Sequence, residues 1–135
     1  MTTIMLFFLH KLLASLAVLS MITGVSAAVF FRRNNRWLKI HKSLNISAVL
    51  VLFLGLLTVG TMVFQYEGQH LNGLHPWIGI SAFGFALITL LLGFYQFQAG
   101  AKAKIVRTLH RVFGRLTLIL IIGALILGLM HAGII

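Results

Sequence analysis

The chain has 135 residues, of which 60% are hydrophobic and only 9% charged, whereas soluble domains carry about 25% charged residues, so the composition excludes an ordinary soluble domain and predicts a membrane protein. The formal charge of +10 does not indicate nucleic-acid binding, because ten of the 11 Lys and Arg residues lie in two short clusters, 32–42 and 102–115, between apolar segments. The chain has no cysteine, which excludes disulfides, thiolate metal sites, iron–sulfur clusters and covalent cofactor attachment through Cys-x-x-Cys-His.

Four apolar segments follow one another along the chain, at residues 4–31, 38–64, 75–97 and 109–135. Each has about 20 residues or more, which is the length that an α-helix needs to cross the hydrocarbon layer of a membrane. The links between them are short, so consecutive helices are expected to run antiparallel. The predicted fold is an all-α, antiparallel four-helix transmembrane bundle that forms a single domain over residues 1–135.

The first segment has an alternative interpretation as a cleaved signal peptide, since "GVSA" around Val25 resembles a cleavage site. However, no basic region precedes the apolar run, and the run is long for a signal. Cleavage would also require the basic stretch "RRNNR" to be translocated, which is costly. We therefore interpret this segment as the first membrane helix.

The three links differ in charge. The first link, "RRNNRWLK", and the third, "QAGAKAKIVR", are rich in Lys and Arg, whereas the second, "QYEGQHLNG", has neither and contains the only acidic residue, Glu67. Cytoplasmic loops carry an excess of positive charge. Both chain ends and the second link are therefore expected on the extracytoplasmic side.

Each apolar segment carries one histidine near its N-terminal end: His10, His41, His75 and His110. Because alternate helices run in opposite directions, the first and third of these should lie at the extracytoplasmic level, and the second and fourth at the cytoplasmic level. Two histidines per level are what a b-type haem with two axial ligands requires. A single interfacial histidine is more often an anchor or a hydrogen-bonded core residue, but four in equivalent positions favour two bis-histidine haems.

Small residues recur at fixed distances after these histidines. The residues fourteen positions later are Gly24, Gly55, Thr89 and Ala124, which lie on the same helix face about 21 Å further along. The third and fourth segments also carry glycine four and eighteen positions after the histidine, at Gly79, Gly93, Gly114 and Gly128. A helix that ligates one haem must leave room for the other, so we predict that the six glycines pack against haem. Helix–helix packing is the alternative.

Other polar residues receive weaker assignments. His70 lies in a link and His131 at the end of the last segment; both are expected on the extracytoplasmic side, where they could compete as ligands. Lys11 should extend to the extracytoplasmic surface. Arg111 and Arg115 are expected to set topology, although either could pair with a haem propionate.

Three motifs resemble the cytochrome b561 family: "LKIHKSLN" at His41, "LHPWIGI" at His75 and "LHRVFGRL" at His110 are similar to its second, third and fourth core helices. The first helix matches in His10 and in the basic link that follows. The resemblance implies that His10 shares a haem with His75 and His41 with His110, the pairing that topology also predicts. Eukaryotic members usually have two further flanking helices, and many carry a lysine, near the ascorbate site, at the position of Leu38.

The sequence therefore predicts electron transfer through two b haems, from a cytoplasmic donor to an extracytoplasmic acceptor. Such a protein would be a transmembrane oxidoreductase or electron carrier. We expect a multi-pass protein of a bacterial inner membrane rather than an organelle membrane. Ascorbate is one donor, with Arg36 and Lys39 as candidate binding residues; quinone and a redox protein stay open as partners, as does a homodimer.

The rival interpretation is a membrane-anchor cytochrome b subunit that exchanges electrons with quinone or a soluble partner. A proton or metal carrier is disfavoured, because the apolar segments contain no carboxylate.

Overall fold

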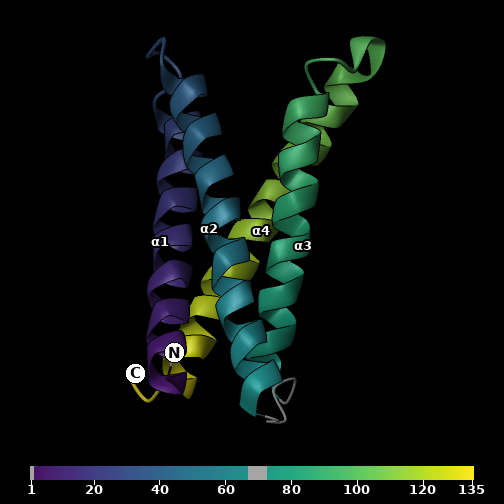
Figure 1. The fold of residues 1–135 in the computed structure, drawn as a ribbon. Helices are drawn as coiled ribbons and strands as arrows, with labels where there is room; N and C mark the ends of the chain where they lie inside the picture. The colour runs from purple at the N-terminus through teal and green to yellow at the C-terminus, as the bar shows by residue number, and fades with distance from the viewer. Residues whose placement is uncertain (1, 67–72) are drawn as a thin grey trace.

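The structure is a computed structural model that describes residues 2–66 and 73–135 (Figure 1). Within them the chain forms four long α-helices: α1 (Thr3–Phe30), α2 (Trp37–Tyr66), α3 (Leu74–Tyr95) and α4 (Ala103–His131). A short 3₁₀ turn, η1 (Gly100–Lys102), precedes α4. All four helices are long and apolar enough to cross a membrane, which confirms the predicted all-α transmembrane bundle. Glu67 and His70, in the second link, lie outside the described residues.

The predicted bounds of α1, α2 and α3 agree with the observed ones to within two residues, but those of α4 were wrong. This helix begins at Ala103 rather than at residue 109, because Lys104 and Arg107 favour helix although they are not apolar. It ends at His131 rather than at residue 135. Gly133 follows with φ 66°, and Ile134 N–H donates to the Leu129 carbonyl at 3.0 Å, which together form the Schellman motif that closes many helices.

The four helices associate as two antiparallel hairpins. α1 packs along α2, and α3 packs along α4, while the hairpins meet where α1 contacts α4 and α2 contacts α3 (Figure 1). Alanines fill the centre of the bundle: Ala17, Ala48, Ala82 and Ala86 are at most 2% exposed. Small residues allow helix backbones to approach closely in a membrane.

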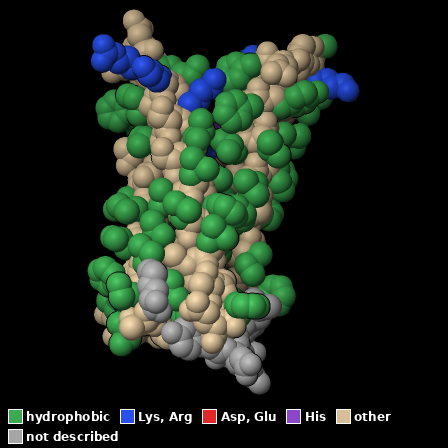
Figure 2. Space-filling model, in the orientation of Figure 1, with side chains coloured by type: hydrophobic (Ala, Val, Ile, Leu, Met, Phe, Trp, Pro, Cys, Tyr) green, Lys and Arg blue, Asp and Glu red, His purple; other side chains and the backbone are tan. Residues whose placement is uncertain are grey.

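Large apolar side chains face outward along the whole bundle, as the green surface in Figure 2 shows. In a membrane these side chains contact lipid, so their exposure here is expected. Lys and Arg gather at the end of the molecule opposite the two chain termini (Figures 1 and 2). We call this the basic end; it comprises Arg32, Arg33, Arg36, Lys39, Lys42, Lys102, Lys104, Arg107, Arg111 and Arg115. The opposite end is called the terminal end.

Candidate functional site

The four histidines that lie near the helix beginnings form two pairs. The ring centroids of His10 on α1 and His75 on α3 are 6.3 Å apart, with the rings at 83° to each other. Those of His41 on α2 and His110 on α4 are 6.1 Å apart, at 87°. The second pair lies toward the basic end and the first toward the terminal end. Each pair takes one helix from each hairpin.

The spacing within each pair suits a single metal atom between two imidazoles. A metal–imidazole bond is about 2 Å long and the ring centroid lies roughly 1 Å behind the nitrogen, so two rings on opposite sides of a metal have centroids about 6 Å apart. No group of three or more His, Cys, Asp or Glu side chains that could hold a metal occurs among residues 2–66 and 73–135. Among the described residues each site thus offers two imidazole ligands, which fits a haem iron, since the macrocycle supplies the remaining ligands.

Each of the four imidazoles is bonded through Nδ1 to a backbone carbonyl on the other helix of its own hairpin. The four distances are His10 to Gly55 at 2.8 Å, and His41 to Gly24, His75 to Ala124 and His110 to Thr89 at 2.9 Å each. A carbonyl oxygen can only accept, so Nδ1 must carry the hydrogen and donate it. Nε2 is then left with its lone pair free, which is the tautomer that can bind a metal.

These four acceptors are the residues that lie fourteen positions after a histidine. The exchange is reciprocal within a hairpin: His10 donates to Gly55, fourteen after His41, and His41 donates to Gly24, fourteen after His10. The antiparallel arrangement explains the pattern, because fourteen residues carry a helix about 21 Å to the level of its neighbour's histidine. The four positions could be predicted from their shared offset in the sequence, but their role as carbonyl acceptors for the imidazoles could not.

Two of the glycines predicted to pack against haem lie directly against imidazole rings. A Cβ atom added at Gly93 would lie 3.1 Å from Cε1 of His110, and one at Gly128 would lie 2.9 Å from Cε1 of His75. These glycines are eighteen positions after His75 and His110, respectively. Their lack of a side chain lets the histidine of the neighbouring helix fit against the backbone.

The other four glycines have different surroundings. A Cβ at Gly24 would overlap the side-chain amide of Asn45 and lie 3.1 Å from Cβ of Leu44. At Gly55 and Gly114 the nearest contact would be an ordinary 3.5 Å, whereas nothing lies within 4 Å at Gly79. Contact of any of these glycines with haem stays a prediction.

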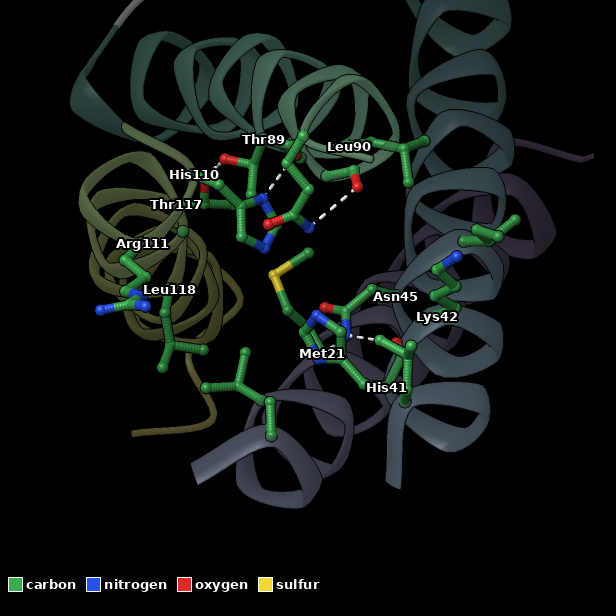
Figure 3. Close-up of a pocket in the computed structure, with 18 of the residues that line it drawn as sticks. Met21, His41, Lys42, Asn45, Thr89, Leu90, His110, Arg111, Thr117 and Leu118 are labelled. Atoms are coloured by element: carbon green, nitrogen blue, oxygen red, sulfur yellow. Dashed lines mark hydrogen bonds between the residues drawn. The ribbon is translucent and has the colours of Figure 1, made fainter. Parts of the chain in front are cut away.

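A cavity of about 560 Å³ separates His41 from His110, a volume within the roughly 300–1,000 Å³ of small-molecule and cofactor pockets. Figure 3 shows the two histidines on opposite walls with Met21 between them. Met21 is a flexible side chain that can adapt to a bound group. Asn45 lies one turn after His41 and donates from Nδ2 to the His41 carbonyl at 2.7 Å.

Five cations line this cavity: Arg32, Lys42, Arg107, Arg111 and Arg115. Only Arg111 and Arg115 were expected from the sequence as possible partners of a propionate, because basic residues near membrane helices resemble topology signals. Lys42 crosses from α2 toward α3, with Nζ 4.2 Å from the centre of the Phe97 ring. Arg32 lies 6.0 Å from the Trp37 ring.

The two candidate donor-binding residues lie outside that cavity. Lys39 lines a second, more open cavity of about 480 Å³, together with Asn35, Leu38, Lys42, Ser43 and Ile46. Arg36 is exposed and lines neither cavity. Leu38, Lys42 and Ile46 line both, so the second cavity adjoins the first.

Two other residues named in the sequence analysis lie at the terminal end. His131 is exposed at the last position of α4. Lys11, beside His10, places Nζ 4.6 Å from the centre of the Phe7 ring.

The family described as eukaryotic cytochrome b561 matches residues 3–135, nearly the whole chain. No curated protein and no solved structure matches the chain significantly.

Proposed function

Because the chain belongs to the cytochrome b561 family, whose members bind b-type haem and transfer electrons across membranes, we propose that it holds two haems, one at each histidine pair. His10 and His75 ligate the first, and His41 and His110 ligate the second. The observation that carries the proposal is the repeated geometry: two imidazole pairs with centroids 6.3 and 6.1 Å apart, each ring fixed through Nδ1.

The residues of the chain prepare these sites before any cofactor binds. The four Nδ1–H bonds fix each ring in the tautomer that presents Nε2, and they hold its orientation through the backbone of a rigid helix. A bound haem supplies one-electron exchange at its iron. Met21, Leu90 and Leu118 give the site near the basic end apolar walls against which a macrocycle could pack.

The positions of the two sites support transfer across the bilayer. His41 is bonded to Gly24, which is fourteen residues along α1 from His10, so the two pairs lie about 21 Å apart along the helices. That separation is a large part of the roughly 30 Å hydrocarbon thickness. One site therefore serves each leaflet.

The charges support an orientation. With ten Lys and Arg residues at the basic end, the positive-inside rule makes this end cytoplasmic and puts both chain termini outside. An anionic donor such as ascorbate would be drawn to the five cations around the His41–His110 cavity. Electrons then pass to the His10–His75 site and to an acceptor outside.

An absorption spectrum of the purified, dithionite-reduced protein tests the proposal. We expect the α and Soret bands of a six-coordinate b haem and a haem-to-protein ratio of two. The ratio should fall to one in His75→Ala and in His110→Ala. A wild-type ratio of one, or no visible bands, contradicts the two-haem proposal.

A further inference from the structure

The Gly55 carbonyl, which holds His10, accepts a second side-chain hydrogen bond. His10 Nδ1 donates to it at 2.8 Å, and the Thr58 hydroxyl donates to it at 2.7 Å. Within residues 2–66 and 73–135, the carbonyls that hold the other three histidines receive no second side-chain donor. His10 thus differs from the other three histidines, because its acceptor carbonyl is shared with a second side-chain donor.

The direction of the Thr58 hydroxyl is unusual for this chain. The other threonines whose hydroxyls bond to their own helix all donate to the carbonyl four positions earlier: Thr23, Thr61, Thr89, Thr108 and Thr117. Thr58 donates three positions earlier. A helical threonine can donate to the carbonyl three or four positions earlier. At Thr58 the three-residue geometry directs the hydroxyl to the Gly55 oxygen, which also accepts from His10.

We propose that Thr58 raises the reduction potential of the haem at the His10–His75 site, acting as a positioning residue through Gly55 and His10. This inference rests on the proposed function. An oxygen that accepts two donors shares its partial negative charge between them, so it withdraws the Nδ1 proton of His10 less strongly. The imidazole is then a weaker electron donor to iron, and ferric iron, the more electron-poor form, is stabilised less.

The inference gives the two haems unequal potentials. At the basic end, Nδ1 of His41 and of His110 each donate to a carbonyl that accepts no second side-chain donor among the described residues, although Asn45 Nδ2 also lies 3.2 Å from His41 Nδ1. The hydroxyl of Thr58 favours the reduced form only at the terminal end. Electrons that enter at the basic end are thereby drawn along the direction proposed above.

A redox titration of the purified protein that carries both haems tests this role. Thr58→Val keeps the side-chain shape and removes the hydroxyl, whereas Thr58→Ser keeps the hydroxyl. Thr61→Val is the matched control, because Thr61 makes the same kind of bond on an exposed face of α2, to the Leu57 carbonyl, which holds no histidine. His75→Ala identifies which component of the titration belongs to the His10–His75 site.

The measured quantity is the ratio of reduced to oxidised haem at the His10–His75 site, at the midpoint potential that this haem has in wild type. In Thr58→Val we expect it to fall roughly threefold, which is about 30 mV downward because a tenfold change in a one-electron ratio corresponds to 59 mV. Thr58→Ser and Thr61→Val should match wild type, and the other component should not move. Thr58→Ala should repeat the shift, which keeps the test decisive if valine disturbs packing and haem is lost.

The two proposals fail in different ways. If wild type holds fewer than two haems, or if His75→Ala removes neither component, the proposed function is wrong. If both haems are present and assigned, and if the potential in Thr58→Val or Thr58→Ala equals that of wild type, the role of Thr58 is wrong. A shift of the same size in Thr61→Val would also overturn it, since that hydroxyl has no path to a ligand.

Discussion

His41 donates a hydrogen bond at 2.9 Å to the carbonyl of Gly24, a residue of the helix that carries His10 of the other histidine pair. The same relationship holds between His10 and Gly55 and, in the other hairpin, between His75 and Ala124 and between His110 and Thr89. Each helix therefore contributes an imidazole to one site and a backbone acceptor to the other. A shift of one helix along its neighbour would disturb both sites together.

The first prediction concerns the ligands. His41→Ala or His110→Ala should remove the haem near the basic end and leave the other largely intact, because each pair draws on separate imidazoles. His10→Ala or His75→Ala should do the reverse. Haem content and the redox titration of each purified variant measure this. Survival of both haems in His75→Ala would mean that His70 or His131 acts as a ligand on that side.

The second prediction concerns Gly128. Gly128→Ala places a Cβ 2.9 Å from Cε1 of His75, closer than packed atoms tolerate, so the His75 ring or the helix backbone must shift. We expect loss or displacement of the haem ligated by His75, while the haem ligated by His110, on the same helix as Gly128, is retained. The matched control is Gly123→Ala, where nothing lies within 4 Å. Equal spectra and haem contents for the two variants would contradict the role assigned to Gly128.

The helices and the levels of the histidines could be predicted from the sequence, because hydropathy and the position of one histidine per segment depend on local pattern alone. The partners of the histidines could not. A backbone carbonyl is the same at every residue, so the acceptor role of Gly24 or Gly55 leaves no mark beyond small size. Likewise, a glycine such as Gly93 indicates close approach without revealing whether an imidazole or a macrocycle approaches.

The sequence also could not predict which basic residues line the cavity. Arg32, Lys42 and Arg107 line it, yet in the sequence they belong to basic clusters that the positive-inside rule explains fully. The two hairpins pack together through α1 with α4 and α2 with α3. Only this packing decides which of the basic residues face the cavity and which face water. The start of α4 was missed for a related reason. The apolar run begins at residue 109, whereas the helix already begins at Ala103, among basic residues.

The third prediction compares two glycines that hold equivalent positions. A side chain at Gly24 would overlap the Asn45 amide beside His41, whereas a Cβ at Gly55 would make an ordinary contact of 3.5 Å with Leu13. Gly24→Ala and, more strongly, Gly24→Leu should therefore reduce haem content at the His41–His110 site, and Gly55→Ala should leave haem content near wild type. Haem-to-protein ratios and absorption spectra of the variants provide the test. A wild-type spectrum for Gly24→Leu would show that this glycine serves only helix packing.

The fourth prediction concerns the donor site at the basic end. Arg36 and Lys39 precede His41 by less than two helical turns, but the cavity itself is lined by Lys42 and Arg111. Exposed charges steer a ligand over about 8 Å at physiological salt. Replacing Arg36 and Lys39 by Gln should slow haem reduction by ascorbate and weaken its dependence on salt, because attraction of the anion is reduced. Dithionite should still reduce both haems fully.

A second pair of substitutions locates the site more closely. Lys42→Gln with Arg111→Gln removes two charges, as the first pair does, but from side chains that line the cavity next to His41 and His110. If the donor binds at the cavity mouth, this pair should slow reduction by ascorbate more than the first pair, with stopped-flow absorbance as the measurement. Equal rates in wild type and both double variants would exclude a donor site at these residues. If wild type is not reduced by ascorbate at all, ascorbate is not the donor, and the same two double variants can be tested with a quinol or a reduced redox protein. The open cavity lined by Leu38, Ser43 and Ile46 is the surface that adjoins the site for such a donor.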